Sequence, residues 1–400
     1  MRQGFLDVLI AGRYRGRAIA FLAAGFVLLV TTVVLPATGP FQFPDYGVNV
    51  GTTGGGTVER IEELERQPGS RGDVVTERIT VSLDGAPEVE PVVIERRYVA
   101  GATITIEVAA GDRVLVTRTE TAEGPAYYIA DRMRTGALWI LGGAFVLLVL
   151  AVGRWHGLGS LIGLGASFLV IVRFVIPGIL AGLDPVAVAV AGALTIVATT
   201  LLLAHGPNAR TALAIAATAL ALGATSVLSV VVVRMLALGG LADEDPLQLF
   251  ALTGGAIDAR GLLLAGFILG ALGVLDDVTT TQVGTVAELR SANAALGPRE
   301  LYRRAMNVGR DHVAATVNTL MLAYAGAALP LLLVLATQGE PGSVLIHREL
   351  FATELARTLA GSLGIVSAVP IATVLAALAF GRGGSGSGSG NDRSEGGATL

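Results

Sequence analysis

Long apolar runs alternate with short polar or charged segments along most of this chain. The first run covers residues 18–35; Arg13, Arg15 and Arg17 precede it and Pro36 follows it. A run of about 20 apolar residues is what an α-helix needs to cross roughly 30 Å of hydrocarbon. The pattern predicts membrane-spanning helices. We interpret the first as an uncleaved anchor rather than a signal peptide, because no convincing small-residue cleavage site follows it.

Residues 37–134 have a different character, being polar and rich in Gly, Val, Thr and charge. Apolar and polar residues alternate there in short segments separated by turn signals such as Asp84-Gly85 and Gly111-Asp112. These segments are Val74–Leu83, Val92–Val99, Thr103–Val108 and Arg113–Thr119. Alternation of this kind is typical of half-buried strands. It predicts a small all-β module of about five short strands, for which a partly open barrel of the OB kind is suitable.

Seven more apolar runs follow the β module. They cover residues 136–152, 157–176, 186–204, 212–233, 261–283, 313–336 and 356–380. We therefore predict a polytopic α-helical membrane protein with about eight transmembrane helices. Its domains are an N-terminal arm and anchor (1–36), the β module (37–134), a seven-helix bundle (135–380) and a flexible Gly/Ser tail (381–400).

The distribution of arginine predicts the orientation in the membrane. With the N-terminus inside, the loops on the cytoplasmic side carry a dense set of arginines, whereas the acidic segment 243–245 falls in an outer loop; the arginines of the long segment 37–134 do not count, because long loops translocate largely regardless of charge. These cytoplasmic arginines are Arg154, Arg210, Arg290, Arg299, Arg303, Arg304 and Arg310. Positive residues favour the cytoplasmic side. Both termini are thus expected in the cytoplasm, and the β module outside the bacterial cytoplasmic membrane.

Composition excludes several kinds of chemistry. The chain has no cysteine, so disulfides, thiolate nucleophiles and iron–sulfur ligation are absent. All 28 basic residues are arginine, which removes a phosphate-loop lysine and a Schiff-base lysine. The four histidines are scattered, and a net charge of −4 leaves no nucleic-acid footprint. We expect no cofactor, no metal site and no catalytic residues, and the lipid bilayer as the chain's surroundings.

One run does not behave like a plain span. The uncharged part of 261–284 ends at Leu275, and its 15 residues reach only ~22 Å as a helix. Either Asp276 and Asp277 lie within the membrane or the helix breaks there. Ionisable groups at such depth are costly and are functional candidates by default. The plainer alternative is that the Asp pair caps the span at the membrane interface.

Helical spacing adds neighbours to the Asp pair. Asp276 shares a helix face with Thr280, and Asp277 shares one with Thr281, since each pair is four residues apart. Gln282 follows one turn further on. The recurring glycines of this run permit close helix packing or local unwinding. They are Gly266, Gly270 and Gly273.

Polar residues in two later runs are further candidates. Asn318 and Tyr324 lie in the seventh span and are expected to face the Asp pair, unless they serve only as hydrogen-bonding groups between helices. Glu354 and Arg357, three residues apart near the start of the eighth span, are expected to form a local ion pair or part of an outer gate.

Three passages together resemble the bacterial YibE/F family of membrane proteins. They are the glycine-rich passage from Gly270 to Asp276-Asp277, the passage from Thr316 to Gly326 that contains Asn318 and Tyr324, and the passage from Gly361 through Gly364 to Pro370. The order of anchor, β module and multi-span bundle is similar too. The resemblance implies an integral membrane protein, often regarded as permease-like, and supplies no substrate and no catalytic residues.

Two functions of different classes remain open. The first is a permease or secondary transporter coupled to a proton or small cation through the Asp pair. The second is a non-transporting scaffold or envelope-assembly factor whose β module binds an extracytoplasmic partner. An intramembrane enzyme is disfavoured because the Gly-x-Gly-Asp sequence of aspartyl proteases is absent. The oligomeric state is open, since Gly159-x-x-x-Gly163 and Gly266-x-x-x-Gly270 fit packing within one chain or between two.

Overall fold

The computed structural model describes residues 24–25, 27–34, 52–69, 72–84, 91–100, 106–121 and 124–381. The chain divides into two compact units: Gly47–Val152, and Met1–Tyr46 with Gly153–Leu400. The predicted bundle begins at residue 135, whereas the compact helical unit begins at Gly153. The boundary falls inside α3 (Thr135–Val170), where Arg154 has a non-helical backbone with φ of 50°. A positive φ is uncommon for any residue other than glycine, and at Arg154 it marks a sharp break between the two halves of α3.

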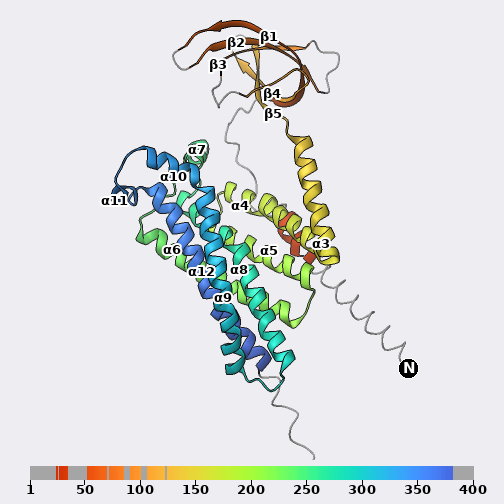
Figure 1. Ribbon diagram of the computed structural model, residues 1–400, viewed down its shortest axis with the longest axis vertical. Coiled ribbons are helices and arrows are strands. Elements are labelled where there is room, and N and C mark those ends of the chain that lie inside the picture. Colours follow the sequence, from red (N-terminus) through yellow and green to blue (C-terminus); the bar gives the residue numbers. More distant parts are fainter. Residues whose placement is uncertain are drawn as a thin grey trace, which may run out of the picture. The chain divides into compact units, whose positions relative to one another are not determined.

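The first unit contains a five-stranded antiparallel sheet (Figure 1). Its strands are β1 (Thr52–Gln67), β2 (Val74–Leu83), β3 (Val92–Val99), β4 (Arg113–Thr121) and β5 (Gly124–Arg132). The strand order is β3-β2-β1-β4-β5, and β3 and β5 also come into contact. Alternate residues such as Val58, Ile79 and Val114 form its apolar core. Strands of period two bury one face in this way.

The number of strands was predicted, but not all of their positions. The alternating segments at β2, β3 and β4 are strands, as expected. The prediction of a strand at 103–108 is wrong in the described part of that segment, because residues 106–109 form no strand. The long β1 and the final β5 were missed. β1 has three consecutive glycines near its start and contains two register shifts, after Val58 and after Glu63, and both features break the simple alternation.

One buried ion pair stands out in this sheet. Glu77 of β2 pairs with Arg96 of β3 and also accepts a hydrogen bond of 3.1 Å from the hydroxyl of Tyr98. Arg96 in turn donates to the carbonyl of Ile106. Burial, and then the charge of Glu77, raise the pKa of the Tyr98 phenol. Buried charges persist only when paired in this manner.

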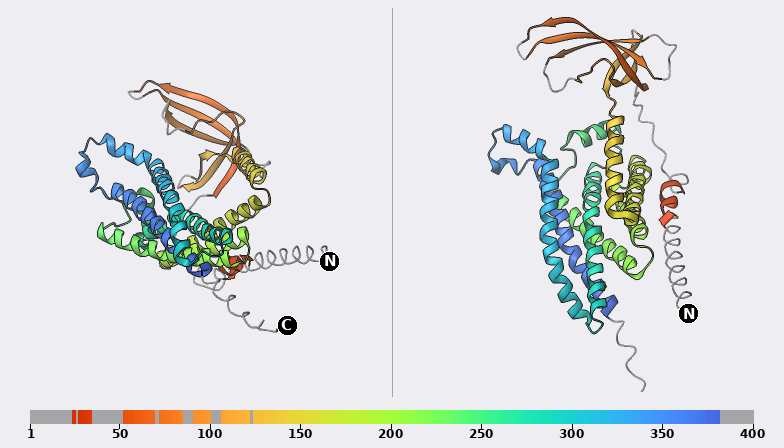
Figure 2. Two further views of the ribbon diagram at one scale, coloured as in Figure 1. Left: turned by 60° about the horizontal axis from the view of Figure 1, so that its bottom comes forward. Right: turned by 45° about the vertical axis from the view of Figure 1, so that its right-hand side comes forward.

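The second unit is a helical bundle (Figure 2). Its elements after α3 are η2 (Ile171–Val175), α4 (Ile176–Leu180), α5 (Pro185–His205), α6 (Ala209–Met235), α7 (Glu244–Leu252), α8 (Ala259–Ala292), α9 (Pro298–Ala327), α10 (Leu329–Thr337), α11 (Gly342–Leu345) and α12 (Glu349–Gly381). The helix starts follow local chemistry: Asp184, Asn208 and Asp258 cap α5, α6 and α8 by accepting backbone N–H bonds.

Every apolar run predicted after the β module lies in a helix. Among the described helices, six are long and apolar enough to cross a membrane, and a seventh span results if α9 and α10 are taken as one. These two helices are bent by 59° where they meet, next to Pro330. Of the first predicted run, 18–35, the structure describes residues 24–25 and 27–34, and all of these are helical, with Val30–Val34 forming the short helix η1.

Helix α8 lies at the centre of this unit. It contacts α5, α6, α9 and α12, and its side chains Ile268, Leu275 and Val286 are completely buried. The predicted alternative of a break at the Asp pair is wrong, because α8 runs unbroken through 34 residues. The apolar residues of its neighbours continue to pack against it beyond Asp277, which explains why the helix does not end at the charges.

A glycine of α12 sets the packing of α12 against α6. A Cβ atom built at Gly364 would lie 2.8 Å from Cγ2 of Thr225. We predict that Gly364→Leu lowers the free energy of unfolding by about 2–3 kcal/mol, because overpacking forces the helices apart. Thermal unfolding in detergent checks this. The control is Gly223→Leu on α6, where a Cβ meets no other described atom within 4 Å. Equal tolerance of both changes would contradict the packing.

Candidate functional site

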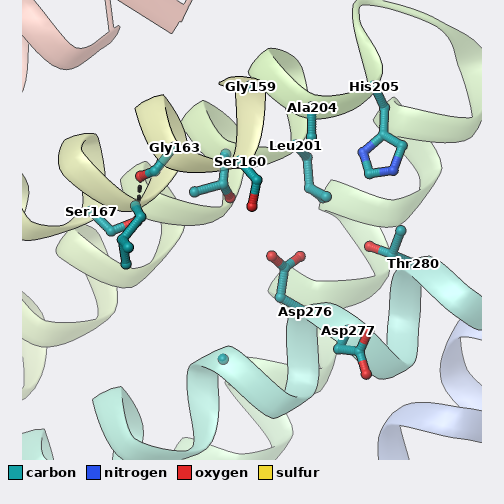
Figure 3. A pocket seen from close by; sticks show the side chains of 13 residues that line it. Gly159, Ser160, Gly163, Ser167, Leu201, Ala204, His205, Asp276, Asp277 and Thr280 are labelled. Atoms are coloured by element: carbon teal, nitrogen blue, oxygen red, sulfur yellow. Dashed lines mark hydrogen bonds between the residues drawn. The ribbon is translucent and has the colours of Figure 1, made fainter. Parts of the chain in front are cut away.

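A pocket of about 480 Å³ opens against α8 at the Asp pair. The helix segment 157–180, α5 and α8 each contribute to its wall (Figure 3). The polar lining consists of Ser160, Ser167, Thr200, His205, Asp276, Asp277 and Thr280. Carboxylate, hydroxyl and imidazole groups therefore converge on one space within an otherwise apolar bundle.

Glycines bring the first two walls close together. A Cβ at Gly159 would lie 3.4 Å from the carbonyl oxygen of Leu203, and one at Gly163 would lie 3.5 Å from Cγ2 of Thr200. The small-residue spacing of this segment thus serves packing against α5 within one chain. On the third wall, Gly273 leaves room beside Asp276, since a Cβ there meets no described atom within 4 Å.

Asp276 is the central group of the pocket. Its carboxylate points into the pocket, toward the side of Ser160 and Leu201 (Figure 3). The buried Oδ1 atom has no hydrogen-bond partner among the residues that the structure describes. Thr280, one turn on, lines the same pocket, and its buried hydroxyl is likewise unpartnered within the described chain. Buried polar atoms are nearly always hydrogen-bonded in folded proteins, so these two oxygen atoms are available to a ligand or to water that enters the pocket.

The two carboxylates have different surroundings. The side chain of Asp277 is 70% exposed and points away from the pocket centre (Figure 3). Its Oδ2 lies 3.7 Å from Nε2 of His312 on α9, too far for a hydrogen bond but close enough for an ion pair when the histidine is protonated. The two carboxylates therefore face different surroundings: Asp276 faces the pocket, and Asp277 faces the surface between α8 and α9.

Threonines and a glutamine fix the rotation of α8 that aims Asp276. Thr279 bonds Thr218 of α6 at 2.5 Å between hydroxyl oxygens. Gln282 is completely buried and accepts a 3.0 Å bond from Thr373 of α12. Gln282, a predicted site residue, lies in the interface of α8 with α12 and does not line the Asp276 pocket. Interhelical hydrogen bonds of this kind hold helices in register.

The remaining predicted residues lie elsewhere. Thr281 and Asn318 are exposed. Neither Asn318 nor Tyr324 lines the Asp276 pocket; Tyr324 approaches Gly270 instead, with its hydroxyl 2.6 Å from an ideal Cβ position. Glu354 and Arg357 form the expected ion pair, at 2.5 Å, and Arg357 also lies over the ring of Phe267.

Sequence reasoning missed the walls opposite Asp276. Ser160, Thr200 and His205 come from segments more than 70 residues away in sequence from the Asp pair, and nothing in their local pattern pairs them with it. The one available signal was the presence of hydroxyl residues within apolar runs. Among the described residues, no group of three or more His, Asp and Glu could hold a metal ion.

These features define a helical-bundle protein with membrane-spanning helix lengths and a polar pocket beside its central helix. The chain belongs to the YibE/F-like protein family, whose model matches residues 141–382. The match runs from within α3 to the end of α12, so it covers every residue of the Asp276 pocket and leaves the five strands outside. The family resemblance of the sequence is confirmed. No curated protein and no solved structure matches this chain.

Substitutions of two adjacent threonines, Thr279 and Thr280, test whether the hydroxyl of Thr280 in the pocket is free of a hydrogen-bond partner. We predict that Thr279→Val lowers the free energy of unfolding by about 1 kcal/mol, because it removes the hydrogen bond to Thr218. Thr280→Val should cost nothing or be stabilising in ligand-free protein, since its hydroxyl has no described partner. The two changes are the same in volume and helix position, and thermal unfolding compares them. Equal losses would mean that Thr280 is already satisfied.

Proposed function

We propose that this chain is a multi-pass protein of the bacterial cytoplasmic membrane and acts as a permease or secondary transporter. The observation that carries the proposal is the unpartnered carboxylate oxygen of Asp276 in a polar pocket beside an unbroken apolar helix. Seventeen residues of α8 precede Asp276 and sixteen follow it. A helix of this length, ~51 Å, exceeds the hydrocarbon thickness at both ends, which supports a position for Asp276 well inside the bilayer.

The proposed orientation follows from charge. Arg210, Arg290, Arg299, Arg303 and Arg304 lie toward the bundle end where α8 turns into α9, and Arg310 lies about three turns into α9. The acidic residues Asp243 to Asp245 lie in the connection between α6 and α8, at the other end of α8. Both termini are then cytoplasmic. The sheet lies outside the membrane, and its strand order with contact between β3 and β5 supports an OB-like, partly open barrel.

A small cation is the ligand that the pocket favours. A charged carboxylate deep in a membrane costs about 3 kcal/mol on insertion scales, and a bound proton or monovalent cation removes that charge. Hydroxyl oxygens of Ser160, Thr200 and Thr280 add neutral oxygen ligands around it. Transporters commonly place coupling-ion sites near the middle of the bilayer. In this proposal, Asp276 holds the cation at a fixed place on α8, and the pocket around it opens alternately to the two sides of the membrane.

The proposed site predicts a cation response that depends on one aspartate. Wild type should gain about 2.7 kcal/mol of stability at a concentration 100 times the dissociation constant of the bound cation. Asp276→Asn should abolish this gain. Asp277→Asn, the adjacent control, should keep it, because Asp277 lies outside the centre of the pocket. The measurement is thermal unfolding in detergent, with Na⁺, K⁺ and a pH series.

Either of two results would contradict the cation site. One is a response that survives Asp276→Asn in folded protein. The other is the absence of any response to Na⁺, K⁺ or pH in wild type. The second result would favour the alternative function, a scaffold whose extracytoplasmic sheet binds a partner and whose polar membrane residues serve only packing.

A further inference from the structure

All exposed residues in the body of α8 lie on one stripe. Between Gly261 and Leu289, six positions are exposed, at intervals of three, four or seven residues. They are Gly266, Gly270, Gly273, Asp277, Thr281 and Glu288. At 3.6 residues per turn these positions fall on a single face of the helix. The rest of α8 is covered by its four neighbouring helices.

This stripe is chemically unlike a surface that faces lipid. It carries glycines, a threonine and two carboxylates, and no large apolar side chain of α8 is exposed. The exposed faces of α6 and α12 are the opposite, with Val227 and Val231 on the first and Leu359 and Leu363 on the second. Polar groups on a lipid-facing helix surface are costly and rare. The stripe is therefore unsuited to lipid, and Asp277 is its carboxylate without an arginine partner among the described residues, since Glu288 pairs with Arg210.

Two pockets open on the stripe, separated along the helix axis. The first is the Asp276 pocket, which includes Gly273 and Asp277. The second, of about 120 Å³, is lined by Leu262, Leu263 and Gly266 of α8, by Thr353 and Arg357 of α12, and by residues between Gly240 and Pro246. Thr353 is 4% exposed, and its hydroxyl oxygen has no partner among the described residues. The second pocket thus also holds a polar group without a described partner, the hydroxyl of Thr353. The charge of Arg357 in the same pocket is compensated by Glu354.

Tyr324 of α9 lies between the two pockets. Its hydroxyl oxygen would be 2.6 Å from a Cβ at Gly270, the stripe residue between Gly266 and Gly273. Only glycine leaves space for the phenol there. Tyr324 also lies one turn before the 59° bend between α9 and α10, and its carbonyl accepts the N–H of Ala328 at that bend. Proline interrupts the backbone hydrogen bonds of a helix, and Pro330 near the start of α10 accounts for the bend.

We propose that the stripe of α8 is the path along which the cation crosses the bundle, and that Tyr324 over Gly270 closes the path between its two pockets. The inference rests on the proposed transport function and extends it to a route, a closure point and a charge preference. A path lined by carboxylates and hydroxyls, with no uncompensated positive side chain among these lining residues, suits a small monovalent cation.

The natural absence of cysteine makes the path directly testable, because any introduced thiol is the only one. Single cysteines replace Gly266, Gly273 and Thr281 on the stripe, with Val227→Cys and Leu363→Cys as controls on exposed apolar faces. A Cβ at either glycine meets no described atom within 4 Å, so these variants should fold. Stripe cysteines should react with a hydrophilic cationic methanethiosulfonate at least about tenfold faster than the controls, since reaction requires an accessible thiolate.

Closure by Tyr324 is tested by adding the reagent to one side at a time, in right-side-out and inverted vesicles. In the wild-type background, G266C should react from one side, and G273C and T281C from the other. Adding Tyr324→Ala should let G273C react from the G266C side as well. Met321→Ala, on an exposed face of the same helix, is the control and should leave the pattern unchanged.

Three results would overturn the path. Stripe cysteines could be as unreactive as the controls, G273C could form a disulfide-linked dimer on oxidation, or sidedness could persist in Tyr324→Ala. The first two would make the stripe a covered packing face, and the third would remove the role of Tyr324. Labelling needs no bound cation, so it tests the path separately from the cation site. A reactive stripe without an Asp276-dependent cation response would keep the path and overturn the cation site. An unreactive stripe with an Asp276-dependent cation response would keep the cation site and overturn the path.

Discussion

The packing of α8 against four other helices is the constraint on which the rest of the structure depends. Its apolar side chains are all used against α5, α6, α9 and α12, and the hydrogen bonds from Thr279 and Gln282 fix its rotation. Only one face is left over. Because the helix cannot rotate without burying a charge or exposing its core, Asp276 is held facing the pocket and Asp277 on the open stripe. The packing that buries the apolar side chains of α8 therefore also orients the carboxylate of Asp276 toward the pocket.

The helices of the bundle were predictable from the sequence because each appears as an apolar run long enough to cross a membrane. The polar positions within α8 were predictable too, since helical spacing places Asp276 and Thr280 on one wall. The effect of the Asp pair on the helix was not. A charge after 15 apolar residues suggested a break, but tertiary packing from α9 and α12 continues past it. The actual break lies between α9 and α10. Pro330 could be seen in the sequence, but the 59° bend beside it could not be predicted from it.

What the sequence could not supply is pairing between distant segments. The wall formed by Ser160, Thr200 and His205 depends on how the segment 157–180 and α5 pack, and that in turn depends on Gly159 and Gly163. Rotation about the helix axis decided the rest: Asn318 faces outward, and Gln282 turns into the interface with α12. Strands were harder than helices for a similar reason, since β1 is defined by its partners and tolerates two register shifts that hide its alternation.

Charge movement in reconstituted liposomes tests the central claim, that Asp276 binds a cation during transport, most directly. Purified wild type, Asp276→Asn and Asp277→Asn are adsorbed on a solid-supported membrane, and transient currents are recorded after jumps in Na⁺, K⁺ or pH. The account predicts a current for one cation in wild type and in Asp277→Asn, and none in Asp276→Asn. A current of equal size in folded Asp276→Asn, or no current from wild type with any of the three, would contradict it.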